Sequence, residues 1–179
     1  DGTRATLTDP AGNTQNSAYD ALGRLETLTR GDGSTRTFTY DAADQVLTNS
    51  EGSRTITYIY DLNGNVASVT TGAGATTSFT HDSLDRMTGV TDPSGGAIVM
   101  TYDAVGRLAN KRDRANALTT FGYDERGQFT QRTDPEGKAW AYAYDADGRL
   151  IRSTSPVGNS TNMTYDSRGL VSTLSTPLG

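Results

Sequence analysis

The sequence predicts an all-β fold in which tandem β-hairpins form a continuous curved or spiral antiparallel sheet. Two observations predict it: a short motif returns about every 21 residues, and the residues before each copy alternate between large apolar and small polar side chains. Gly and Thr are abundant, while runs of the residues that favour helices are missing. We expect residues 1–179 to be a single repeat region of about eight repeats.

The motif is a Tyr-Asp or His-Asp pair, with Gly or Asp three residues after the aspartate. The pairs begin at positions 19, 40, 60, 81, 102, 123, 144 and 165, so all spacings but one are 21 residues. Asp at the start of a turn can bond the backbone two residues on, and the last turn position favours Gly because it often needs positive φ. We therefore expect a structural role for Tyr19, Asp20, Gly23, Tyr40, Asp41, Tyr60, Asp61, Gly64, His81, Asp82, Tyr102, Asp103, Gly106, Tyr123, Asp124, Gly127, Tyr144, Asp145, Gly148, Tyr165, Asp166 and Gly169.

Two repeats have an aspartate where the others have the turn glycine. These residues are Asp44 and Asp85, and Asp tolerates the left-handed region better than most residues. The same turn is therefore expected in all eight repeats.

A second turn separates successive Tyr-Asp pairs. It contains proline and glycine at 9–12, 92–95, 134–137, 155–158 and 176–179, and versions without proline are expected near 32–33, 72–74 and 116. Glu51-Gly52 comes early in its repeat, which predicts a shorter hairpin loop there. Each repeat is therefore two strands and two turns.

The strand that enters each Tyr-Asp pair alternates with period two. In Phe38-Thr39-Tyr40 and Tyr142-Ala143-Tyr144 the large rings share one face, and small residues share the other. This ladder of rings is expected to pack across strands. A platform for binding sugars is the alternative interpretation, because sugars stack on exposed rings.

Composition excludes several classes of function. The net charge is −5, with 16 basic and 21 acidic residues scattered singly, so nucleic acid is not an expected partner. Cysteine is absent, which excludes disulfides and thiolate chemistry. No apolar run is long enough for a membrane span, and no signal-peptide pattern occurs.

The sequence supports no catalytic, cofactor-binding or metal-binding assignment. Asp145-Ala146-Asp147-Gly148 resembles an acidic calcium loop, but such a loop needs more oxygen ligands at set spacing. His81 is the only histidine and is expected to replace a tyrosine ring. Arginines at 24, 86, 107 and 149 form a broken row, and we expect them to pair with the carboxylates of the turns.

The segments at 102–108 and 144–150, which read Tyr-Asp-Ala-x-Gly-Arg-Leu, closely resemble the YD repeat of the Rhs family. This family includes bacterial Rhs polymorphic toxins, the B and C components of Tc toxins, and animal teneurins. The resemblance covers essentially the whole chain and implies a sheet that spirals into a hollow β-shell, of which this chain is a segment. The core segment that supports self-cleavage in many members is missing, so cleavage is not carried over.

The resemblance implies a function as a wall segment of a shell that encapsulates a C-terminal toxin or effector domain before delivery. The alternative is a cell-surface adhesion or carbohydrate-binding repeat module. The implied partners are the remainder of a longer chain, with further repeats and an enclosed toxin domain, and glycan is not favoured. We expect a bacterial protein that is secreted or delivered from the cell envelope, with this chain as a fragment of it.

Overall fold

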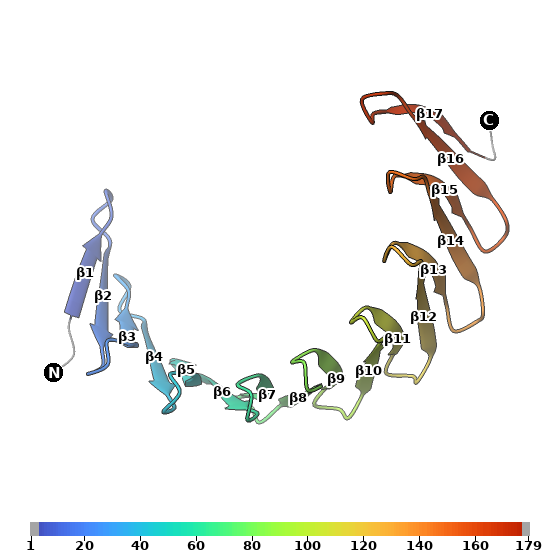
Figure 1. Cartoon of the computed structure of the whole chain (residues 1–179). Coiled ribbons are helices and arrows are strands. Elements are labelled where there is room, and N and C mark those ends of the chain that lie inside the picture. Colours follow the sequence, from blue (N-terminus) through green and yellow to red (C-terminus); the bar gives the residue numbers. More distant parts are fainter. Residues whose placement is uncertain (1–3, 177–179) are drawn as a thin grey trace. The chain divides into compact units, whose positions relative to one another are not determined.

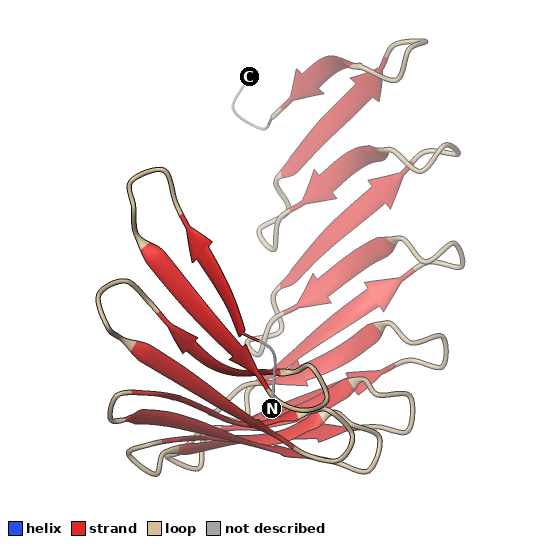
Figure 2. Ribbon diagram, turned by 90° about the vertical axis from the view of Figure 1, so that its left-hand side faces the viewer, coloured by secondary structure: helices blue, strands red, loops and turns tan. Residues whose placement is uncertain are grey.

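A computed structural model describes residues 4–176, and every regular element in that range is a β-strand. Figure 2 shows strands and the loops between them, without helices. Accordingly, no helix able to cross a membrane occurs among these residues. The predicted all-β class is confirmed.

The chain divides into two compact units, Asp1–Gly96 and Ala97–Gly179. In unit 1 each strand pairs antiparallel with the next strand in the chain. Its strands are β1 (Arg4–Thr8), β2 (Thr14–Tyr19), β3 (Leu25–Thr29), β4 (Thr35–Tyr40), β5 (Val46–Glu51), β6 (Arg54–Tyr60), β7 (Val66–Thr71), β8 (Thr76–His81) and β9 (Met87–Thr91), labelled in Figure 1.

Unit 2 repeats the same plan, again with antiparallel pairing between successive strands. Its strands are β10 (Ala97–Tyr102), β11 (Leu108–Arg112), β12 (Leu118–Tyr123), β13 (Phe129–Thr133), β14 (Ala139–Tyr144), β15 (Leu150–Thr154), β16 (Ser160–Tyr165) and β17 (Val171–Ser175). The prediction of two strands per repeat, made from the spacing, is confirmed in both units.

The two faces of each sheet differ as the alternation predicted. On one face large residues pair across strands, as in Tyr58 with Val69 and Met163 with Leu174. On the other face threonines pair, and the hydroxyls of Thr39 and Thr48 lie 2.7 Å apart. Such cross-strand pairs are the unit of sheet stabilisation.

Neither unit buries a core of its own. No described residue is fully buried, and the accessible surface of the chain is 11710 Å². A compact globular protein of 19.0 kDa would expose about 8,400 Å². The rings are therefore only half-buried by their neighbours in a single layer of strands.

The turn residues adopt the predicted conformations. Gly23, Gly64 and Gly106 have φ of 81°, 91° and 92°, and Asp44 and Asp85 enter the same left-handed region at 63° and 60°. The turn at 176–179 lies mostly outside the described residues.

The early hairpin of the second repeat has the shorter loop that was predicted. Glu51 pairs with Arg54, which leaves a two-residue loop of Gly52 and Ser53. Gly52 has a φ of 59°, as the first central residue of a type II′ turn requires.

A feature that the spacing did not reveal is a register shift at each Tyr-Asp pair. Ala18 faces Thr27 but Tyr19 faces Leu25, so one extra residue lies on the outgoing strand. The same shift occurs at Tyr40, Tyr60, His81, Tyr102, Tyr123, Tyr144 and Tyr165. A β-bulge of this kind changes the direction in which a side chain points, and here a bulge lies at the equivalent position of every repeat.

Candidate functional site

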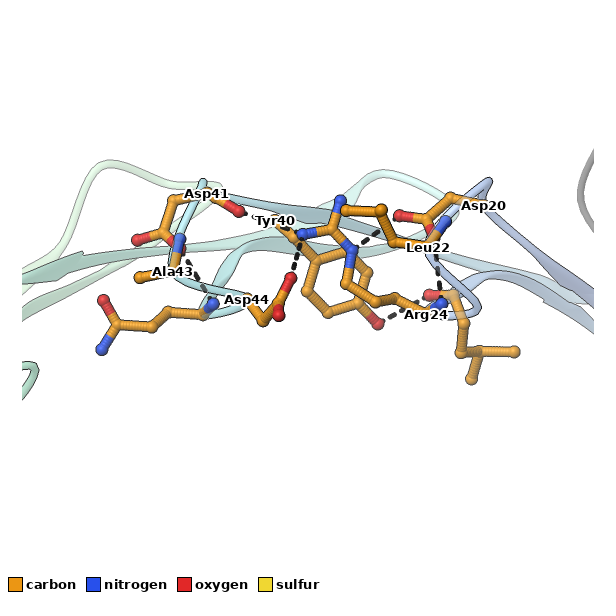
Figure 3. Close-up of polar contacts among 9 residues, drawn as sticks. Asp20, Leu22, Arg24, Tyr40, Asp41, Ala43 and Asp44 are labelled. Carbon is orange, nitrogen blue, oxygen red and sulfur yellow. Dashed lines mark hydrogen bonds and ion pairs between the residues drawn. The ribbon is translucent and has the colours of Figure 1, made fainter.

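The Tyr-Asp turn is built around the aspartate carboxylate. Asp20 Oδ1 accepts the backbone N–H groups of Leu22 and Arg24, each at 2.9 Å (Figure 3). The Asp20 N–H donates to the Arg24 carbonyl at 2.8 Å, and the Gly23 N–H donates to the Asp20 carbonyl at 3.0 Å. One carboxylate therefore satisfies two amides that the turn leaves without strand partners.

All eight repeats use the same pair of contacts. The carboxylates that accept the amides two and four residues later are those of Asp20, Asp41, Asp61, Asp82, Asp103, Asp124, Asp145 and Asp166. Asp9, Asp92, Asp113 and Asp134 do the same in the second turn. These carboxylates serve the backbone, and no group of three or more metal-ligating side chains gathers within residues 4–176.

Arg24 links its own turn to the next one. Its Nε donates to Asp20 Oδ2 at 2.7 Å, while its Nη1 donates to the Asp41 carbonyl at 3.0 Å and to Asp44 Oδ1 at 2.7 Å. Its guanidinium also lies 4.7 Å from the centre of the Tyr40 ring. Figure 3 shows this arginine between the two turns. The expected pairing with turn carboxylates is confirmed, and the contact with the next repeat adds to it.

The same contacts recur in unit 2. Arg107 donates to Asp103 Oδ2 at 2.7 Å and to the Asp124 carbonyl at 3.1 Å, and it lies 4.6 Å from the centre of the Tyr123 ring. Arg149 likewise donates to its turn carboxylate and covers the next ring, that of Tyr165, at 5.0 Å. Cation–π contacts of this type contribute about 0.5–1 kcal/mol at exposed sites.

A second link between repeats runs from the tyrosine hydroxyl back to the preceding repeat. Tyr40 donates to the Leu25 carbonyl at 2.7 Å, and Leu25 belongs to the preceding repeat. The hydroxyls of Tyr60, Tyr123, Tyr144 and Tyr165 reach back in the same way, to Val46, Leu108, Phe129 and Leu150. Each of these rings therefore joins two repeats by packing and by a hydrogen bond.

The junction between the third and fourth repeats is built differently. Asn65 replaces the arginine, and its amide donates to Asp61 Oδ2 at 3.2 Å and to Asp85 Oδ1 at 2.7 Å. His81 replaces the tyrosine, and its Nδ1 lies 3.7 Å from Asp61 Oδ2. Asn65 thus stands where an arginine would cover this ring, and an open groove of about 390 Å³ lies beside the ring, lined mainly by apolar groups that include Phe79.

The hydrogen bonds of the turns shift the acidity of their carboxylates. The backbone N–H groups of Arg24, Arg107 and Arg149 hold the pKa values of Asp20, Asp103 and Asp145 below the usual 3.8. The side-chain bond to Asp20 raises the pKa of Arg24 in return, and the bond to Asp145 does the same for Arg149. Partial burial raises the pKa of the Tyr60 and Tyr144 hydroxyls. The turns are therefore built for ionised aspartate and neutral tyrosine.

The geometry weighs against sugar stacking on the rings. Guanidinium groups already cover Tyr40, Tyr123 and Tyr165, and Arg132 lies 4.8 Å from the centre of the Trp140 ring. At these four rings a sugar would have to displace the cation before it could stack on the covered face.

Sequence reasoning placed the aspartates and glycines of the turns but missed the contact between arginine and the next tyrosine. The signal was present, because Arg24, Arg107 and Arg149 each precede a tyrosine by 16 residues. The spacing alone does not show that the guanidinium lies over the ring, because this contact depends on how the strands of successive repeats pair.

Two family models match the sequence. The model described as RHS Repeat matches residues 19–55 and 60–97, and the model described as Teneurin YD-shell matches residues 90–179, half of the chain. The chain belongs to the Rhs/YD-repeat family. The resemblance stated from the Tyr-Asp motifs is thereby confirmed. No curated protein matches significantly.

Solved structures share the fold of this Rhs/YD-repeat chain. The crystal structure of TcdB2-TccC3-Cdc42 aligns with a TM-score of 0.70 at 19% identity, over 95% of this chain and 12% of its own. TcdB2-TccC3 without its hypervariable C-terminal region aligns with a TM-score of 0.74 at 16% identity, over 98% of this chain and 11% of its own. The Tc holotoxin pore of Photorhabdus luminescens aligns with a TM-score of 0.66 at 17% identity, over 93% of this chain and 12% of its own. The chain thus spans only about an eighth of each of these three solved chains.

Proposed function

We propose that this chain is a structural wall segment of an Rhs-type β-shell, which encapsulates a C-terminal toxin or effector domain before delivery. The observation that carries the proposal is the ladder of junctions, in which a tyrosine hydroxyl joins most hairpins to the preceding repeat and, at several junctions, an arginine adds a second contact. Repeating the same contact extends a sheet without building a pocket for chemistry. The proposed role is mechanical and not catalytic.

The exposed surface supports the same role. A single layer of strands leaves its ring face half-covered, and none of the described residues is buried. Such a layer gains most when its faces meet other parts of a larger assembly. We therefore propose that the partners are further repeats, a core segment and an enclosed domain of one longer chain. The host is then a bacterium that secretes the protein or delivers it from the envelope.

Sequencing the gene on both sides of this segment tests the proposal. We expect more Tyr-Asp repeats, followed by a core segment and a C-terminal domain of unrelated sequence. A reading frame limited to these residues would contradict the proposed shell.

Limited proteolysis of the full-length product tests encapsulation directly. An intact wall should protect the C-terminal domain, and the double variant Arg107→Gln, Tyr123→Phe should make that domain cleavable by weakening one junction. Arg168→Gln is the matched control, because Arg168 contacts Asp166 within its own turn. Rapid cleavage of the wild-type domain would overturn the proposal.

A further inference from the structure

The strands of unit 2 have an unusual distribution of charge. The described strands β10–β17 contain four basic residues, Lys111, Arg112, Arg132 and Arg152, and no Asp or Glu. Every acidic residue of this part of the chain lies in a turn. The strand faces are therefore positive, between acidic turns.

Two of these cations share the ring face. Arg132 lies directly opposite Phe121 on one side and Trp140 on the other, and its guanidinium lies 4.8 Å from the centre of the Trp140 ring. Lys111 lies two strands away, opposite Thr119. Lys111, Phe121 and Arg132 line one open hollow of about 320 Å³. Arg112 and Arg152 occupy positions of the opposite face.

Neither cation on the ring face has an anionic partner. Arg107 and Arg149 bond to carboxylates of their turns, whereas no carboxylate lies within ion-pair distance of Lys111 or Arg132 in the range 4–176. Asp113 also lines the hollow, but its Oδ1 accepts the N–H groups of Ala115 and Ala117. Both cations are exposed, and Trp140 already orients one of them.

We propose that this hollow binds an acidic polypeptide segment, in which two carboxylates flank an apolar side chain. Cross-strand neighbours lie about 5 Å apart directly and about 7–8 Å apart diagonally, so the path from Lys111 through Phe121 to Arg132 is about 12 Å long. An extended peptide covers about 13 Å in four residues, with alternate side chains on one side. A glutamate, an apolar residue and a second glutamate at alternate positions therefore match the lysine, the ring and the arginine.

This partner fits the site better than a nucleic acid. A DNA duplex carries one charge per about 1.7 Å of its axis, far denser than two cations about 12 Å apart. The carboxylates of the turns at both ends of the strands also repel a dense polyanion. Carboxylates spaced along a peptide match both the sparse cations and the ring between them.

Fluorescence gives a direct test, because Trp140 is the only tryptophan in the chain. The probe is the peptide Gly-Glu-Ser-Leu-Ser-Glu-Gly, and the control peptide has glutamine in place of both glutamates. We expect the acidic peptide to change Trp140 emission and to bind the complete chain about ten-fold more tightly than the control peptide. A labelled peptide gives the same affinities by anisotropy, independently of the tryptophan.

Variants locate the binding to one face. The double variant Lys111→Gln, Arg132→Gln should bind the acidic peptide about ten-fold more weakly. The control Arg112→Gln, Arg152→Gln loses the same charge, and its affinity should change by less than about two-fold. Equal losses in both variants, or equal binding of the two peptides by the wild-type chain, would overturn the proposal. Tighter binding of heparin or oligo-dT at the same two residues would overturn the choice of partner.

Discussion

Two junctions between repeats show how one backbone ladder accepts different side chains. In the arginine junction, Arg107 covers Tyr123, whose hydroxyl bonds to the Leu108 carbonyl. In the asparagine junction, Asn65 and His81 take these two places, so a neutral amide replaces the guanidinium. The turn hydrogen bonds to the aspartate are the same in both.

Comparing the two junctions distinguishes the residues that build the turn from the residues that join the repeats. The aspartate and the residue of positive φ set the turn in every repeat, whereas the covering cation and the ring hydroxyl vary. In a repeat protein the stability is nearly a sum of repeat and neighbour terms. We therefore expect stability to vary from one junction to the next while the fold stays constant.

Acid should have the largest effect, because it acts together on several turn carboxylates whose pKa is lowered, namely Asp20, Asp61, Asp82, Asp103, Asp145 and Asp166. The folded pKa values of Asp103 and Asp61 are lowered, through the backbone N–H of Arg107 in the first case and, against partial burial, through Asn65 in the second. A carboxyl with a depressed pKa stabilises the fold above its unfolded value of 3.8, and this stability is lost as the pH falls through the folded pKa. Thermal unfolding should therefore move to lower temperature below about pH 4.

Hydrogen exchange at low pH then compares the junctions. Protonated Asp103 loses its ion pair with Arg107, whereas Asp61 loses its bond to the neutral Asn65 amide and its longer contact with His81. The Arg107 amide should lose more protection than the Asn65 amide. Equal losses at the two amides would show that the guanidinium adds nothing to the arginine junction.

Removing a ring should give the next largest effect. Tyr123→Ala deletes the packing with Phe129, the hydroxyl bond to Leu108 and the surface under Arg107. We expect a loss of about 2–4 kcal/mol in the free energy of urea unfolding, and about 1–2 kcal/mol for His81→Ala. Tyr123→Phe is the control that removes the hydroxyl alone. An equal loss at the two junctions would contradict the comparison.

The turn residues give a smaller contrast. Gly106 has a φ of 92°, so Gly106→Val should cost about 1–2 kcal/mol from backbone strain. Asp85→Gly relieves the strain at a φ of 60° but removes the acceptor of the Asn63 and Asn65 amides. We expect the second change to alter urea unfolding by less than about 0.5 kcal/mol. A gain above that value would show that the Asp85 carboxylate contributes nothing.

Much of this architecture follows from the sequence, because local rules determine it. Period-two alternation predicted the ring and threonine faces, and turn chemistry predicted the positive φ at Gly23, Asp44 and Asp85. The register shift at each tyrosine was not predicted, since a bulge depends on how two strands pair and leaves no mark in the spacing. The contact between the arginine guanidinium and the next tyrosine ring was also not predicted, because it too depends on how the strands pair. The hollow at Lys111 and Arg132 was also missed, because it joins residues of separate strands.

Converting one junction into the other should change stability by less than the loss of the Tyr123 ring or the strain of Gly106→Val. Asn65→Arg with His81→Tyr supplies a guanidinium, a ring for it to cover and a hydroxyl that can reach the Val66 carbonyl. We expect the double variant to gain about 1 kcal/mol in urea unfolding, with less than half of it in the two single variants together. The gain is coupled because the guanidinium needs the tyrosine ring, and the Asp61 carboxylate needs a new donor once the Asn65 amide is gone. Additive single effects would show that ring and cation act independently, and the arginine junction would then be two separate contacts and not one unit.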